Sequence, residues 1–293
     1  MAIKHQLQQS IYSIIKHNRD GSFATQAARR EILFLASKEL VEGGYKLKNV
    51  QGLKQKHIYY LNQLWQERKL SNGTMKNRNA HLRWLCEKLH KANLMPTNDE
   101  LKVGKRRYAS NADNKAIELK DGNLAKVTNP FIYISLHLQR HFGLRREECI
   151  KFKPCVADKG DHIFLESTWC KGGRSRTVPI LTEEARYWLE QSKKLVNYSN
   201  SALIPDSKTY KQQKKLYENQ TKAAGFKHPH GLRHAYAQQR YKELTGWDCP
   251  KAGGPISKKL TREQKAKDKV ARLTISQELG HCREQILVNY CGR

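Results

Sequence analysis

His230 and Arg233 lie three residues apart in the sequence His-Gly-Leu-Arg-His, near the start of the last quarter of the chain. On a helix this spacing places both side chains on one face. A histidine can move a proton near neutral pH, and an arginine binds phosphate through a rigid fork of donors. The pair is therefore half of a phosphoryl-transfer site. Alone, however, the pattern is more typical of a solvated helix face.

Arg145 stands at the N-terminal edge of an expected helix, directly after a turn at Gly143. Free backbone N–H groups and the helix dipole favour anions at such an edge. Glu148, three residues further on, can reach back to brace the arginine. Without other reactive residues, this pattern would indicate only a surface helix start with capping charges.

Lys171 lies beside a Gly-Gly pair, in the segment Trp-Cys-Lys-Gly-Gly that separates two expected strands at 162–168 and 174–180. A Gly-Gly pair between two strands favours a hairpin turn. A lysine on a mobile hairpin can enter a groove and donate a proton from its ammonium group. Most turn lysines are simply solvated, so Lys171 needs the other residues to support a catalytic interpretation.

The charge of the chain points to a polyanionic partner. Its 293 residues include 55 Lys and Arg against 27 Asp and Glu, which gives a formal net charge of +28. Such an excess repels itself in a compact fold unless a polyanion neutralises it, and nucleic acid is the most common one. A membrane partner is less favoured, because the basic residues are spread along the chain and no uncharged stretch reaches membrane-spanning length.

The seven cysteines do not predict a metal site or a disulfide framework. They form no Cys-x-x-Cys pair, so we expect neither a metal nor a cofactor. Their odd number and scattered positions suit reduced thiols, and the N-terminus lacks the apolar core of a signal peptide. We therefore expect a cytoplasmic protein.

The apolar pattern predicts a mainly α fold with a small β-hairpin or sheet (α+β), divided into two domains. The expected organisation is a helical DNA-binding domain at 1–95, a basic linker at 96–110 and a catalytic domain at 111–293. In the second domain, helices are expected at 121–142, 182–195, 207–223 and 230–245. Residues 246–270, rich in Gly, Pro and Lys, are expected to form an excursion that is mobile or lies along DNA.

Basic residues on the outer faces of the first domain and in the linker are the candidates for DNA contact. Any one of them is more often a solvated surface charge, whereas the helical domain as a whole favours DNA contact. These candidates are Lys54, Lys56, Lys76, Arg78, Lys105, Arg106 and Arg107.

The motifs of the second domain follow a fixed order, which ends with a histidine in Leu-Gly-His and a tyrosine nine residues later. They are Arg145 with Glu148, Lys171, His230, Arg233, His281 and Tyr290. Over about 120–290, this order resembles the catalytic signature of the tyrosine recombinase, or phage integrase, family. The first domain resembles the core-binding domain of that family in size, helicity and position.

The resemblance implies a mixed α/β catalytic domain that cleaves and rejoins DNA through a 3′-phosphotyrosyl intermediate, without metal or ATP, to integrate or excise a mobile element. Tyr290 would be the nucleophile and His230 would accept its proton. Lys171 would protonate the leaving 5′-oxygen. Arg145, Arg233 and His281 would hold the phosphate, where loss of one donor costs on the order of 10²–10³ in rate. Glu148 would brace Arg145.

The resemblance also implies a homotetramer on double-stranded DNA at synapsis and a monomer in solution. It allows for an accessory DNA-bending protein as a further partner. Family members usually carry a tail after the tyrosine that docks on a neighbouring protomer, and here only three residues follow Tyr290. Either another surface, such as 246–270, links the protomers, or the chain has been truncated. Two other functions stay open. A type IB topoisomerase would relax any supercoiled plasmid, and a DNA-binding regulator would form no covalent adduct.

Overall fold

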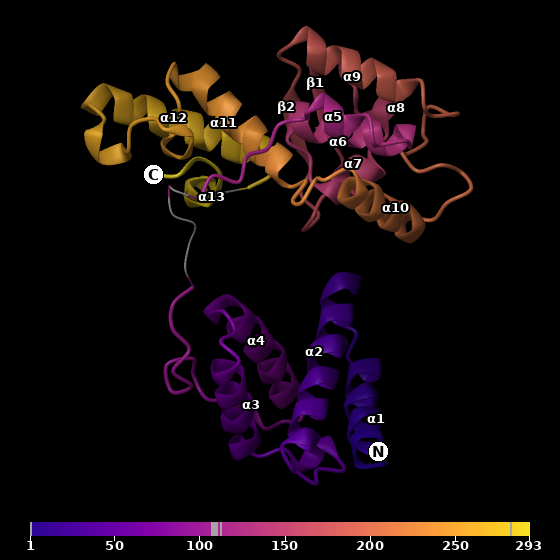
Figure 1. The fold of residues 1–293 in the computed structure, drawn as a ribbon, viewed down its shortest axis with the longest axis vertical. Coiled ribbons are helices and arrows are strands. Elements are labelled where there is room, and N and C mark those ends of the chain that lie inside the picture. Colours follow the sequence, from indigo (N-terminus) through magenta and orange to yellow (C-terminus); the bar gives the residue numbers. More distant parts are fainter. Residues whose placement is uncertain (1, 107–110, 112, 282) are drawn as a thin grey trace. The chain divides into compact units, whose positions relative to one another are not determined.

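The computed structural model describes residues 2–106, 111, 113–281 and 283–293. The chain divides into two compact units, Met1–Tyr108 and Ala109–Arg293. Figure 1 shows that helices dominate both units and that the only sheet of the described residues, a two-stranded one, lies in the second. The expected mainly α fold with a small β-hairpin is confirmed.

The first unit is a bundle of four helices around its own apolar core. The helices are α1 (Ala2–His17), α2 (Phe23–Glu42), α3 (Gln55–Glu67) and α4 (Asn72–Lys88). Serine caps begin two of them, since the side chains of Ser22 and Ser71 accept hydrogen bonds from backbone N–H groups of the first turn. Gly43 ends α2. The core contains Leu33, Ile58, Leu61, Trp65 and Leu82.

The first part of the expected linker belongs to this bundle. Leu101 and Val103 are buried in its core, and the carbonyl of Leu101 accepts a hydrogen bond of 2.8 Å from the side chain of Gln66. Thr97 and Glu100 bind each other and close the turn that brings these residues in. The sequence suggested a linker because Leu101 and Val103 are isolated apolar residues that follow Pro96 and a run of polar residues, and they form no periodic pattern.

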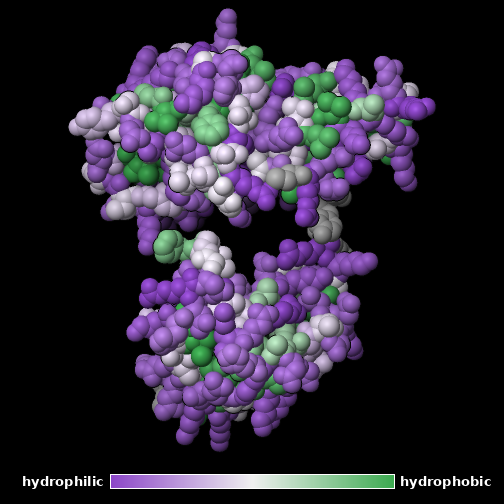
Figure 2. Space-filling view, turned by 180° about the vertical axis from the view of Figure 1, so that it is seen from behind, coloured by the Kyte–Doolittle hydropathy of each residue, from purple (hydrophilic) through white to green (hydrophobic). Residues whose placement is uncertain are grey.

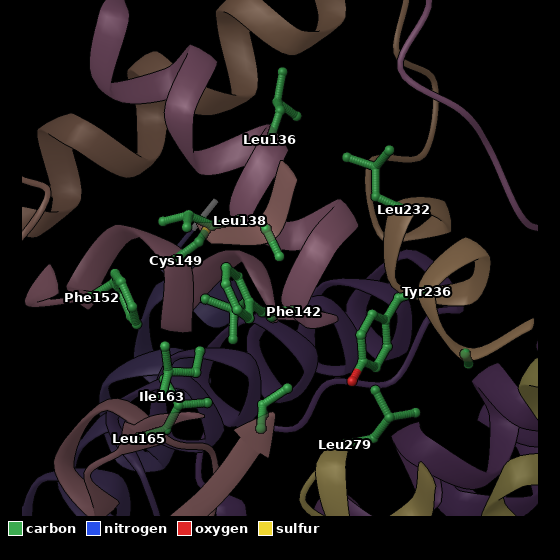
Figure 3. Packing of buried hydrophobic residues seen from close by; sticks show 14 of the residues in the cluster. Leu136, Leu138, Phe142, Cys149, Phe152, Ile163, Leu165, Leu232, Tyr236 and Leu279 are labelled. Atoms are coloured by element: carbon green, nitrogen blue, oxygen red, sulfur yellow. The ribbon is translucent and has the colours of Figure 1, made fainter. Parts of the chain in front are cut away.

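The second unit contains nine helices among its described residues, together with one hairpin. The helices are α5 (Asp121–Leu124), α6 (Pro130–Phe142), α7 (Arg146–Lys151), α8 (Pro154–Ala157), α9 (Glu183–Lys193), α10 (Tyr210–Ala223), α11 (Gly231–Thr245), α12 (Arg262–Glu278) and α13 (Val288–Cys291). Leu136, Leu138 and Phe142 of α6 are fully buried, and Figure 3 shows them beside Leu232 and Tyr236 of α11 and Leu279 after α12. This packing fixes the ends of α6, α11 and α12 relative to one another.

The expected helix over 121–142 is two helices. Asn129 has an extended backbone, and its side chain accepts a hydrogen bond from the N–H of Ile132. Pro130 then occupies the first turn of α6, where its missing N–H costs nothing. The apolar run continues across this break, which is why hydrophobic periodicity alone did not reveal it.

The hairpin pairs β1 (His162–Leu165) with β2 (Arg176–Pro179) in antiparallel register, with Leu165 opposite Arg176. Both strands are shorter than expected, and the first ends early because residues Ser167–Trp169 form a 3-10 turn. Gly172 and Gly173 have φ values of 79° and 65°, so the turn uses the left-handed backbone conformation that glycine tolerates.

Residues 246–270 pack on the second unit, so the expected mobile excursion is wrong. Lys251 is buried, and its ammonium group donates to the carbonyls of Asp113 and Asn289. From Arg262 onward the chain is helix α12, which begins with a capping box between Thr261 and Gln264. The Gly, Pro and Lys content hid this helix, although its cap is readable in the sequence.

The visible surface of each unit is mainly hydrophilic, with smaller hydrophobic groups between the polar side chains (Figure 2). Among the described residues, no helix combines the length and the apolar character that crossing a membrane requires.

Candidate active site

Arg233 is the buried centre of the candidate site. It lies in the first turn of α11, has no exposed surface, and donates from Nε to the Tyr290 hydroxyl over 3.3 Å. Its terminal nitrogens donate to the backbone carbonyls of Gly143 and Leu279. Burial lowers the pKa of Arg233 to about 10, so the guanidinium stays charged at neutral pH.

Tyr290 lies against this guanidinium from the short helix α13. The tyrosine is only 6% exposed, and its hydroxyl lies 3.5 Å from Nε2 of His281. The same histidine nitrogen lies 3.4 Å from Nη2 of Arg233. His230, the residue that precedes α11, lies about as close by ring centroid, at 6.2 Å from the Tyr290 ring against 6.0 Å for His281. The structure thus brings four of the predicted residues together from three separate segments.

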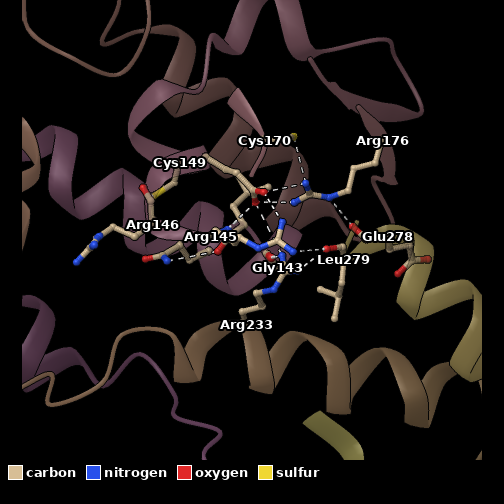
Figure 4. Close-up of polar contacts among 12 residues, drawn as sticks. Gly143, Arg145, Arg146, Cys149, Cys170, Arg176, Arg233, Glu278 and Leu279 are labelled. Atoms are coloured by element: carbon tan, nitrogen blue, oxygen red, sulfur yellow. Dashed lines mark hydrogen bonds and ion pairs between the residues drawn. The ribbon is translucent and has the colours of Figure 1, made fainter. Parts of the chain in front are cut away.

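Arg145 and Glu148 form the predicted pair at the start of α7. The Glu148 carboxylate accepts from the backbone N–H of Arg145 over 2.7 Å and from its Nη1 over 2.6 Å. Nη2 of Arg145 donates to the carbonyl of Leu279, which also accepts from Arg233. Arg145 is half-buried, and 18% of its side chain is exposed. Figure 4 shows both guanidinium groups meeting at the end of α12.

The Glu148 carboxylate is fully buried and ionised. Burial raises its pKa, but a hydrogen bond from Arg176 and the charges of Arg176, Arg145 and Arg233 outweigh that effect and bring the pKa to about 2. The group of three arginines with one carboxylate keeps a net positive charge, which suits an anionic ligand.

His230 and His281 are neutral at physiological pH. Desolvation comes first and the positive charges of Arg233 and Arg145 second, and together they lower the pKa of each imidazole to about 4. A neutral imidazole has one free lone pair, so each ring can accept a proton.

Lys171 is exposed at the hairpin turn and forms part of the wall of a cleft of about 990 Å³. Arg145, Glu148 and His230 line the same cleft. The predicted lysine therefore lines the same cleft as Arg145, which together with Arg233 forms the candidate phosphate clamp, whereas Arg233 and Tyr290 are not among the lining residues.

The predicted DNA-binding residues of the first unit differ in exposure. Lys54, Lys56 and Lys105 are exposed and Lys76 is half-buried. Arg106 is also exposed, and it donates to the side chain of Asn77 over 3.0 Å.

Arg78 turns inward. It lies over the ring of Trp65 and 3.7 Å from the buried carboxylate of Glu39, so it contributes to the core rather than to a free basic surface. Arg107 lies outside the described residues.

Two residues beside the reactive groups were not predicted. Arg176 on β2 donates to both oxygens of Glu148, over 2.9 and 2.6 Å. His234, directly after Arg233, packs against the ring of Tyr290 with a centroid separation of 4.5 Å. The sequence did contain a pattern that could have identified Arg176. Side chains alternate along a strand, so Arg176 lies on the same inward face as Val178, and an arginine buried on that face needs a buried partner.

Family models match both the N-terminal part and a large part of the second unit. A family model described as Integrase matches residues 106–239, and one described as Phage integrase, N-terminal, matches residues 4–94. No curated protein matches the sequence.

Three solved structures share the fold over nearly the whole chain. The Tn1549 transposon integrase (residues 82–397), in complex with circular intermediate DNA, has 12% identity and a TM-score of 0.56, with 98% of this chain and 95% of that chain covered. The XerH recombinase bound to difH has 14% identity and a TM-score of 0.55, with 97% and 80% covered. A lambda integrase dimer bound to a core site has 12% identity and a TM-score of 0.57, with 97% and 75% covered.

The chain belongs to the tyrosine recombinase family of phage integrases, and the two matched models together cover residues 4–94 and 106–239. It is accordingly a site-specific recombinase, an enzyme that cleaves and rejoins DNA strands.

Proposed function

We propose that Tyr290 is the nucleophile of this recombinase and that Arg145 and Arg233 bind the scissile phosphate. One observation carries the proposal: the Tyr290 hydroxyl lies within hydrogen-bond distance of both Arg233 and His281. A phenol held in a group of phosphate-binding residues is poised to attack a phosphodiester.

In the proposed reaction, the phenolic oxygen of Tyr290 attacks phosphorus and the bond from phosphorus to the 5′-oxygen breaks. The products are a 3′-phosphotyrosyl link and a free 5′-hydroxyl. Arg145, Arg233 and His281 stabilise the negative charge that develops on the non-bridging oxygens. Lys171 supplies the proton that the leaving oxygen needs. Glu148 holds Arg145 in place.

The proton of Tyr290 goes to a neutral imidazole. His230 is the acceptor that the motif suggested, and its pKa of about 4 leaves it unprotonated and able to accept. The imidazole nitrogen within hydrogen-bond distance of the Tyr290 hydroxyl is Nε2 of His281. Replacing each histidine by glutamine and comparing the pH dependence of cleavage separates the two roles.

The proposal includes the partners of the enzyme. Double-stranded DNA binds along the catalytic cleft and along the basic residues Lys54, Lys56, Lys76, Lys105 and Arg106 of the first unit. The protein is cytoplasmic, monomeric before it binds DNA and tetrameric at synapsis, where it integrates or excises a mobile element. An accessory DNA-bending protein could assist that assembly.

A trapping assay tests the proposal. The protein is incubated with a nicked duplex from the junction between its element and the chromosome, so that the cleaved fragment diffuses away and the covalent state accumulates. We expect a detergent-resistant protein–DNA band that disappears in Tyr290→Phe. Tyr198→Phe is the matched control, because Tyr198 is 71% exposed and far from the site in sequence.

Each other outcome favours a different function. A band that persists in Tyr290→Phe would disprove the assignment of the nucleophile. Tight binding without a band on several junction sequences would favour a DNA-binding regulator. Relaxation of any supercoiled plasmid, without preference for a junction sequence, would favour a type IB topoisomerase.

A further inference from the structure

Arg176 is a buried cation whose three side-chain nitrogens all contact the protein. Its side chain is 4% exposed. Two nitrogens donate to the Glu148 carboxylate, and Nε donates to the carbonyl of Glu278 over 2.8 Å. Nη1 also lies 3.3 Å from Sγ of Cys170. A guanidinium engaged in this way cannot bind a phosphate itself.

These contacts join three parts of the active site (Figure 4). Glu148 braces Arg145, and Glu278 directly precedes Leu279, whose carbonyl accepts from Arg145 and Arg233. Cys170 directly precedes Lys171 on the hairpin. The Arg176 side chain therefore contacts three groups. They are the carboxylate that braces Arg145, the backbone next to Leu279, and the hairpin turn that carries Lys171.

The geometry at Glu148 shows what this contact does for Arg145. Arg176 binds both carboxylate oxygens, whereas the guanidinium of Arg145 reaches only one of them. A carboxylate free of Arg176 would attract Arg145 into a bidentate pair, because that is the preferred geometry of arginine with a carboxylate. By occupying Glu148, Arg176 leaves donors of Arg145 available at the surface, where the side chain is 18% exposed.

We propose that Arg176 is a positioning residue for DNA cleavage: its bidentate contact with Glu148 keeps Arg145 turned toward the phosphate, and its contact with Cys170 ties the hairpin to the clamp. The inference rests on the proposed roles of Arg145 and Lys171. It adds a buried residue that acts through them and does not itself touch DNA.

The first test is Arg176→Lys, which keeps the charge but cannot form the bidentate fork. We expect covalent-complex formation under single-turnover conditions to slow by on the order of 10- to 100-fold, as for other residues that orient a reactive group. The Kd for DNA should change little. Thr177→Ala is the matched control, since Thr177 is the next residue of β2 and is exposed. Rates are compared well below the Tm of each variant, so that lost folding is not read as lost chemistry.

The second test asks whether Arg176 acts through Glu148. We expect Arg176→Gln to slow cleavage strongly in the wild-type background and much less when Glu148→Gln is already present. Arg176→Gln should also add an acidic limb to the pH profile, because the hydrogen bond from Arg176 is the largest factor that holds the pKa of Glu148 down. Glu148 is also faced by Arg145 and Arg233, and the double variant should lack this limb because it has no carboxyl to protonate.

The inference would be overturned if the Arg176→Lys variant cleaved DNA at the wild-type rate. It would also be overturned if Arg176→Gln reduced the cleavage rate equally in the wild-type and Glu148→Gln backgrounds. Absence of the covalent band in the wild-type protein would instead overturn the proposed function on which the inference rests.

Discussion

The ring of His234 lies against the ring of Tyr290, with centroids 4.5 Å apart and planes inclined by 38°. His234 is buried, and its Nδ1 has no hydrogen-bond partner among the described residues. Its contribution to the site is therefore packing. His234 follows Arg233 on α11, so one helix turn supplies both the cation beside the Tyr290 phenol and the ring that packs against it.

Replacing His234 by alanine should impair cleavage more than binding. The phenol would lose its packing partner, and misplacement of a reactive group by about 1 Å can cost 10²-fold in rate. His234→Phe keeps a flat ring and should retain most of the rate. Single-turnover trapping gives the rates, and a filter-binding titration gives the Kd. Equal rates for the alanine and phenylalanine variants would show that stacking on Tyr290 does not matter.

Gly143→Ala should destabilise the second unit and disturb the clamp. Gly143 has a φ of 60°, and a Cβ there would lie 2.6 Å from Cδ1 of Tyr236 and 2.9 Å from Cδ2 of Leu279. We expect a loss of about 1–3 kcal/mol in the free energy of unfolding, from backbone strain and overpacking. The carbonyl of Gly143 also accepts from Arg233, so the rate should fall as well. Urea unfolding measures the first effect and trapping the second.

The control for this change is Gly122→Ala. Gly122 lies in α5, and a Cβ there would meet no atom within 4 Å. Alanine in a helix is favoured over glycine by roughly 0.5–1 kcal/mol, so this variant should be unchanged or slightly more stable. A similar loss in both variants would contradict the steric explanation for Gly143.

The sequence predicted which residues lie together in the candidate site better than it predicted the structure that holds them. His230, Arg233, His281 and Tyr290 were identifiable because phosphoryl transfer restricts the residue types and the spacing of a motif. Arg176 was missed because its role depends on which carboxylate it meets, and strand pairing and packing decide that.

The errors in the fold have two different causes. Local caps such as Asn129 and Thr261 set where α6 and α12 begin and are readable in the sequence, but composition suggested one long helix and a mobile excursion instead. The inward turn of Arg78 toward Trp65 and Glu39, by contrast, depends on the packing of separate helices. Such contacts between distant segments are not encoded in periodicity.

His137 should make the protein sensitive to acid. Its ring stacks on Trp188 with centroids 3.4 Å apart, and neither ring nitrogen has a hydrogen-bond partner among the described residues. Burial, with a smaller effect from His141, lowers its pKa from 6.5 to about 3. Between these pH values the unfolded chain binds a proton that the folded protein does not. The free energy of unfolding should therefore decrease as the pH falls from 6.5 toward 3.

His137→Phe tests this prediction, because it keeps an aromatic ring and removes the titrating group. The variant should be about as stable as the wild type at pH 7.5 and should lose less stability on acidification. Other buried histidines titrate in the same direction, so the measurement is the difference in slope of Tm against pH between the two proteins. An unchanged slope would show that His137 does not contribute.

Lys171→Ala should slow cleavage by on the order of 10²–10⁴, the usual contribution of a general acid. A substrate with sulfur in place of the bridging 5′-oxygen should restore most of this loss. The reason is that a thiol has a pKa near about 8.5, so its thiolate leaves without a proton donor, whereas an alkoxide does not. Arg145→Ala is the control, because phosphate stabilisation is still required and sulfur should not rescue it. Rescue of both variants, or of neither, would remove Lys171 from the proton-donor role.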